Sequence, residues 1–103
     1  MDKKYNVITL CGSTKFKDEF IKARKELTLA GNIVLSVELF GHCGDDVCYS
    51  KDTKQMLDDM HKAKIDMSDE IFVINVDSYI GESTRNEIAY AISQGKRIKY
   101  LIN

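Results

Sequence analysis

The chain has 103 residues, of which 44% are hydrophobic and 30% are charged, and 15 basic residues nearly balance 16 acidic ones. This length fits one domain, expected over residues 1–103, and the charge balance argues against a nucleic-acid partner. No apolar run approaches the roughly 20 residues of a membrane span, and charged residues follow the first methionine where a signal segment would be apolar. We therefore expect a cytoplasmic protein with no membrane partner and with reduced thiols.

Short apolar runs alternate with amphipathic stretches along the chain. The first strand is closed by Gly12, and the third is apolar on both faces, which indicates a central position. Glycines and aspartates make residues 40–46 a long loop, and Ser83 is expected to cap the last helix. The predicted elements are a strand over 5–11, a helix over 16–30, a strand over 33–37, a helix over 53–64 that ends near 66–69, a strand over 71–76, a helix over 83–94 and a strand over 97–102.

This alternation predicts an α/β fold with a parallel sheet, because each strand is followed by a helix long enough for a crossover. In a three-layer Rossmann or flavodoxin-like arrangement the four strands take the order 2-1-3-4. The strand order then reverses between the first and third strands. We expect the loops after these two strands to form a pocket.

Two loop-to-helix junctions follow those strands. One is Gly12-Ser13-Thr14, and the other is Gly81-Glu82-Ser83-Thr84. Free backbone N–H groups, small side chains and hydroxyls suit a phosphate or another anion. Each junction taken alone is better explained as an ordinary helix cap; their expected convergence is what favours a binding site.

Glu87 lies in the early part of the last helix, near this expected pocket. A carboxylate placed there can attack a sugar carbon or stabilise a cation of the oxocarbenium type. The alternative is a surface residue that the helix dipole stabilises.

The segments that carry these residues resemble the nucleoside 2-deoxyribosyltransferase superfamily, which includes the 2'-deoxynucleoside 5'-monophosphate N-glycosidases. The similarity is greatest to a phage and bacterial branch with Gly-Ser-Thr near its start and Ser-Thr-Arg-Asn-Glu before its last helix. The resemblance implies that Glu87 is the nucleophile that takes the deoxyribosyl group from the base. The matching segments are Cys11-Gly12-Ser13, the helix that runs into Asp69, Gly81-Glu82-Ser83-Thr84-Arg85-Asn86-Glu87-Ile88-Ala89-Tyr90-Ala91 and Gly95-Lys96-Arg97.

The second helix departs from the pattern of the superfamily. His61 stands where the superfamily usually has an aspartate that assists at the base or the sugar, with Asp58 and Asp59 nearby. A histidine can protonate a leaving base, since its usual pKa lies near neutrality. The alternative is a solvated histidine on a helix face.

The long loop invites a zinc interpretation, because His42, Cys43 and Cys48 occur in it and His61 follows. The Cys-x4-Cys spacing is loose for a structural site and no second tight pair follows, so we expect no metal and a loop that faces the substrate. Cys11, at the end of a buried strand, is most simply a small core residue. Tyr79, after the third strand, is the best-placed aromatic partner for a base.

The sequence thus predicts an enzyme that cleaves or exchanges the N-glycosidic bond of a deoxynucleoside or its 5'-monophosphate, without a cofactor. The alternative is a nucleotide-binding module that uses the same cleft without turnover. A small domain has little material to wall a cleft, so we also expect a homodimer or higher homo-oligomer with Met56, Met60 and Tyr90 as candidate contacts. The expected catalytic residues are Glu87, His61 and Asp69. The expected substrate-binding residues are Gly12, Ser13, Thr14, Phe16, His42, Asp77, Tyr79, Gly81, Ser83 and Thr84.

Overall fold

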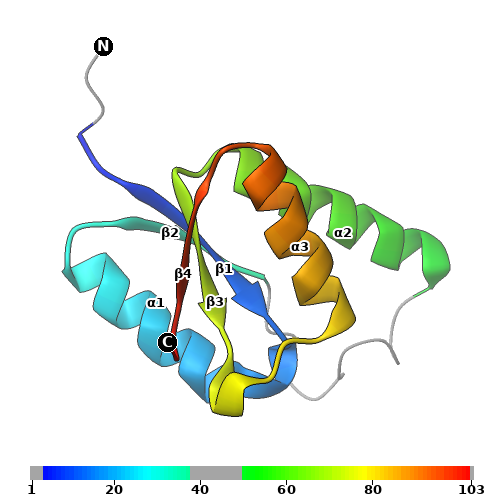
Figure 1. Ribbon diagram of the computed structural model, residues 1–103, viewed down its shortest axis with the longest axis horizontal. Helices are drawn as coiled ribbons and strands as arrows, with labels where there is room; N and C mark the ends of the chain where they lie inside the picture. The colour runs from blue at the N-terminus through cyan, green and yellow to red at the C-terminus, as the bar shows by residue number, and fades with distance from the viewer. Residues whose placement is uncertain (1–3, 38–49, 103) are drawn as a thin grey trace.

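A computed structural model describes residues 4–37 and 50–102 of the chain. Its strands form one four-stranded parallel sheet in the order β2-β1-β3-β4, which confirms the predicted fold class (Figure 1). Short 3-10 turns follow β1 and β3, at Thr14–Phe16 and Val76–Ser78. The elements are β1 (Val7–Gly12), α1 (Lys17–Leu29), β2 (Ile33–Leu35), α2 (Lys51–Asp66), β3 (Glu70–Ile74), α3 (Glu82–Ser93) and β4 (Arg97–Tyr100).

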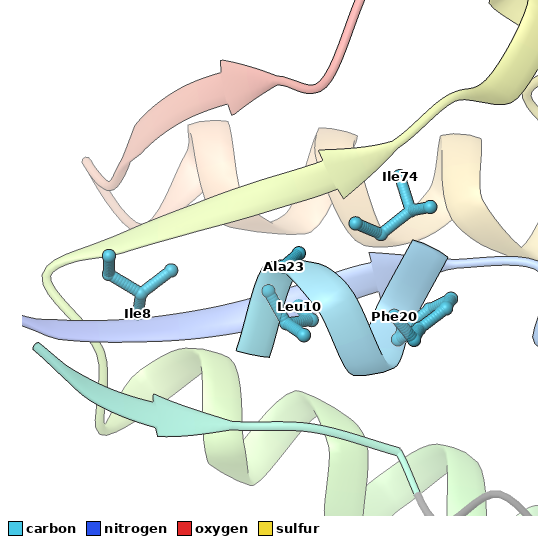
Figure 2. Close-up of a cluster of buried hydrophobic side chains, with 5 residues drawn as sticks. All are labelled: Ile8, Leu10, Phe20, Ala23 and Ile74. Atoms are coloured by element: carbon cyan, nitrogen blue, oxygen red, sulfur yellow. The ribbon is translucent and has the colours of Figure 1, made fainter. Parts of the chain in front are cut away.

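The helices cover both faces of the sheet, with α1 on one face and α2 and α3 on the other (Figure 1). Side chains of β1 alternate between the two faces because successive residues of a strand point in opposite directions. The cluster beneath α1 consists of Ile8, Leu10, Phe20, Ala23 and Ile74 (Figure 2). The cluster beneath α2 and α3 consists of Cys11, Ile65, Ile71, Val73 and Ala91.

The last residue of β1 approaches β3 closely. Gly12 is paired with Ile74 and has a φ of +150°, a conformation that side chains rarely adopt. A Cβ atom at this position would lie 2.9 Å from the carbonyl oxygen of Ile74. Glycine therefore allows the chain to leave the sheet here and enter the loop that the sequence assigns to the pocket.

Two helices begin earlier than the sequence predicts. The Ser50 hydroxyl accepts a 3.1 Å hydrogen bond from the Thr53 N–H and caps α2, which begins at Lys51. The prediction that Ser83 caps α3 is wrong, because Gly81 is the N-cap and Ser83 is the second residue of the helix.

The face of α2 that packs against the sheet is formed by residues four apart in the sequence. His61 and Ile65 are buried and Leu57 is half-buried, which places residues four apart on the face toward the sheet. Met56 and Met60 are 51% and 45% exposed. The two methionines therefore form an apolar strip on the surface of α2.

Within residues 4–37 and 50–102, no helix combines the length and the hydrophobicity that crossing a membrane requires.

Candidate functional site

Three polar side chains from three different elements meet beneath α2 and α3. The Sγ atom of Cys11, on β1, lies 3.4 Å from Nε2 of His61, on α2. The same nitrogen lies 3.6 Å from Oε1 of Glu87, on α3. The Cys11 sulfur and a carboxylate oxygen of Glu87 lie within 4.8 Å of each other. The structure thus brings together Glu87 and His61, two of the three expected catalytic residues, and adds Cys11 to them.

Local structure explains this convergence. Cys11 is the penultimate residue of β1, and its side chain points to the face that α2 and α3 cover. His61 lies one turn before the buried Ile65 on α2. Glu87 lies three residues after Thr84 and four before Ala91, both of which are buried, so it shares the inward face of α3.

Burial controls the charges of this cluster. Removal from water raises the pKa of Glu87 from 4.5 to about 7, although a hydrogen bond from Cys11 acts in the opposite direction. Burial lowers the pKa of His61 from 6.5 to about 4, with Lys64 acting in the same direction. Burial, and then the nearby Glu87 carboxylate, raise the pKa of the Cys11 thiol. At neutral pH, His61 is therefore a neutral imidazole, and it contacts a carboxyl group that ionises near this pH.

Glu87 also borders a pocket of about 140 Å³ between α2 and α3, and its side chain retains 19% exposure there. Burial on one side and access on the other are what a reactive carboxylate requires. Ser83 is the second expected site residue that lines this pocket. The lining residues are Gln55, Asp58, Asp59, Lys62, Ser83, Asn86 and Glu87.

A second group of expected residues lies at the carboxyl ends of β1 and β3. The rings of Phe16 and Tyr79 meet edge to face, with centroids 5.9 Å apart. The Lys15 ammonium group lies 3.7 Å from the centroid of the Tyr79 ring, a cation–π contact. A Cβ atom on Gly81 would lie 3.2 Å from the Tyr79 hydroxyl, so this ring reaches the start of α3. The two loops therefore converge, as the strand order predicts.

The remaining residues of these loops have defined local roles. Ser13 caps the 3-10 turn by accepting a hydrogen bond from the Lys15 N–H, and Thr14 is half-buried. Asp77 and its neighbour Ser78 have φ values of 53° and 63°, which are uncommon for residues other than glycine. Thr84 is buried inside the first turn of α3. These residues shape the edge of the sheet rather than the pocket beside Glu87.

Asp69, the third expected catalytic residue, lies at the opposite end of the strands, where β1 and β3 begin. It immediately precedes β3, and its Oδ2 atom accepts a 2.8 Å hydrogen bond from the N–H of Val7, the first residue of β1. Glu87 instead contacts Cys11 near the carboxyl end of β1. The structure therefore does not bring Asp69 to the candidate site.

Part of the expected site lies outside the described residues. This applies to His42, and the two cysteines of the long loop, Cys43 and Cys48, where no metal is expected, also lie outside these residues. Within residues 4–37 and 50–102, the group of side chains that could hold a metal ion is Cys11, His61 and Glu87.

Several residues that line the pocket are not among the expected site residues. Gln55, Asp58, Asp59 and Lys62 recur at spacings of three and four, which places them on one face of α2. This spacing could have indicated that the four residues share one face of the helix, but a polar face of a helix usually lies toward solvent. Only the neighbouring helix α3 turns this one into a wall of a pocket.

Comparisons with known proteins give no family for this chain. No protein-family model matches the sequence, and a search of curated proteins finds no match.

Proposed function

We propose that the protein cleaves or transfers the N-glycosidic bond of a deoxynucleoside or deoxynucleoside 5'-monophosphate, with Glu87 as the nucleophile. The observation that carries the proposal is the position of the Glu87 carboxyl group, which lies 3.6 Å from His61 Nε2 and still borders the pocket. The resemblance to deoxyribosyltransferases rests on the segment around the same glutamate.

The ionised Glu87 would attack the anomeric carbon of the sugar as the bond to the base breaks, and the base would leave with a proton from solvent. Water, or a second base, would then displace the carboxylate from the covalent glycosyl ester. Two displacements at one carbon retain the configuration of the sugar. A carboxyl group with a pKa near 7 can act both as this nucleophile and as its leaving group at neutral pH.

His61 takes a different role from the one that its residue type suggests. Its burial favours the neutral imidazole, so it is a poor proton donor to a leaving base at neutral pH. Its Nε2 atom faces the Glu87 carboxyl group and the Cys11 thiol. We assign His61 to the positioning of Glu87.

The test is release of free base from each deoxynucleoside and deoxynucleoside monophosphate, followed by chromatography. Glu87→Gln preserves the shape of the side chain and removes its charge, so turnover should fall by at least about a thousandfold while the fold remains. Glu82→Gln is the matched control, because Glu82 is an exposed glutamate on the same helix. Equal rates in the wild type and Glu87→Gln would remove Glu87 from the mechanism.

A second candidate function is nucleotide binding without turnover. The Tyr79 ring is 45% exposed and packs against Phe16, so a base can stack on it by displacing the Lys15 ammonium group, which lies 3.7 Å from the ring centroid. This candidate predicts saturable binding of a deoxynucleoside monophosphate, weakened by Tyr79→Ala, with no release of base. The chromatographic assay separates the two functions directly.

We also propose that the protein binds a small molecule, lies in the cytoplasm and assembles into a homodimer or higher homo-oligomer. The exposed strip of Met56 and Met60 on α2 supports assembly, because exposed apolar side chains one turn apart suit a helix-to-helix contact. Tyr90, the third candidate contact, is half-buried, and its hydroxyl donates a 2.6 Å hydrogen bond to Asp66.

A further inference from the structure

The buried cluster contains three different metal-ligating atoms that face one another. They are the Cys11 sulfur, the His61 Nε2 nitrogen and a carboxylate oxygen of Glu87, and all lie within 4.8 Å of one another. Each comes from a different element of the fold, so the sheet and two helices fix their separation.

Two of the three separations are close to those of a single tetrahedral ion. With Zn–S of about 2.3 Å and Zn–N or Zn–O of about 2.0–2.1 Å, a sulfur and a nitrogen ligand lie about 3.5–3.6 Å apart, and a nitrogen and an oxygen ligand about 3.3–3.4 Å apart. The sulfur-to-nitrogen distance is 3.4 Å and the nitrogen-to-oxygen distance is 3.6 Å. An ion can therefore contact His61 and both of its neighbours once the Cys11 sulfur and the Glu87 oxygen, which lie within 4.8 Å of each other, approach to about 3.6 Å.

We propose that Cys11, His61 and Glu87 form a binding site for a divalent zinc-type metal ion. A thiolate, an imidazole and one carboxylate favour Zn²⁺ or Co²⁺ over Mg²⁺ or Ca²⁺, which prefer oxygen ligands. Three protein ligands leave a fourth tetrahedral position open, which water from the pocket beside Glu87 can fill. Binding releases to solvent the thiol proton of Cys11 and, where Glu87 is protonated, its carboxyl proton, and it places the imidazole proton on Nδ1.

This inference goes beyond the proposed function and does not depend on it. A carboxylate oxygen that coordinates a metal ion is not available to attack a sugar carbon. Metal binding and glycosyl transfer through Glu87 therefore exclude each other. If both proposals hold, Zn²⁺ inhibits release of base, and a chelator restores it.

The test is a titration of the reduced, metal-free protein with Co²⁺ in the absence of a nucleotide. Tetrahedral coordination with one thiolate should produce a near-ultraviolet sulfur-to-cobalt charge-transfer band and intense visible bands at one equivalent of metal, and Zn²⁺ should remove both. Cys11→Ser should abolish the charge-transfer band. The matched control is the double variant Cys43→Ser with Cys48→Ser, which removes the other two thiols and should retain the band.

A second variant guards against a folding defect in Cys11→Ser. Glu87→Gln should weaken Co²⁺ binding at least tenfold, whereas Glu82→Gln should leave it unchanged. Two outcomes would overturn the inference. One is that the wild type shows no charge-transfer band. The other is that the variant without Cys43 and Cys48 loses the band while Cys11→Ser keeps it. Because no substrate is present, these outcomes are independent of whether the protein releases base.

Discussion

The carboxylate of Asp69 accepts a 2.8 Å hydrogen bond from the backbone N–H of Val7, which ties the start of β3 to the start of β1. This contact assigns Asp69 to the structure of the sheet. Asp69→Ala should reduce the free energy of unfolding by about 1–3 kcal/mol, because it leaves a partly buried donor without this charged acceptor. Urea denaturation measures this loss. The rate of base release per folded molecule should not change, and a thousandfold loss in that rate would return Asp69 to the catalytic residues.

The raised pKa of Glu87 predicts how stability depends on pH. The ionised carboxylate is less favourable in the folded chain, so its contribution is most favourable below pH 4.5 and declines as pH rises through about 7. A pKa difference of one unit corresponds to about 1.4 kcal/mol. The free energy of unfolding of Glu87→Gln should therefore increase by roughly 3 kcal/mol relative to that of the wild type as pH rises over this range.

Denaturation of both proteins at several pH values between 4 and 8 measures this gain. His61 titrates in the folded protein near pH 4, and its stabilising contribution is lost as pH falls from 6.5 to about 4. To a first approximation this effect cancels in the comparison, because both proteins retain His61. A constant difference between the two proteins across this range would show that Glu87 ionises as it does in water.

The close approach of Gly12 to β3 predicts a large effect of a single methyl group. Gly12→Ala combines an unfavourable φ of +150° with a Cβ atom only 2.9 Å from the Ile74 carbonyl oxygen. Gly31→Ala is the matched control, since its φ is +99° but its Cβ would meet no atom within 4 Å. Gly31→Ala should cost about 1–2 kcal/mol and Gly12→Ala at least about 3 kcal/mol. Equal losses would mean that β3 moves aside freely.

The exposed methionines of α2 predict a change in assembly. If Met56 and Met60 lie between two copies of the chain, the double variant Met56→Lys with Met60→Lys should shift the protein to a monomer of 11.7 kDa in sedimentation at micromolar concentration. Leu29→Lys is the control, because Leu29 is a strongly exposed apolar residue at the end of α1. A wild-type monomer at the same concentration would remove the prediction.

The parallel sheet was predictable because short apolar runs alternate with helices that have a repeating apolar face. The helix starts were less predictable. Ser50 and Gly81 are adjacent to polar residues, and the apolar spacing that marks a helix begins only after its first turn. A boundary inferred from apolar residues therefore falls too late.

The candidate site was predictable in part. The place of Glu87 near the pocket could be predicted from its position in α3. The burial of His61 could not, because a histidine flanked by Met60 and Lys62 is typical of a helix surface. Its environment depends on the packing of α2 against β1 and α3, which involves residues distant in the sequence. The same reason explains why Cys11 looked like a core residue only.

The two outer strands, β2 and β4, have only three and four residues. On β4, Arg97 and Lys99 extend into solvent while their charged groups stay 3.5 and 3.6 Å from the buried carboxylate of Glu70. Short edges and fixed positive charges are features that prevent another chain from adding a strand to a sheet. We therefore expect the short outer strands and the ion pairs of Glu70 to protect this small domain against edge-to-edge aggregation.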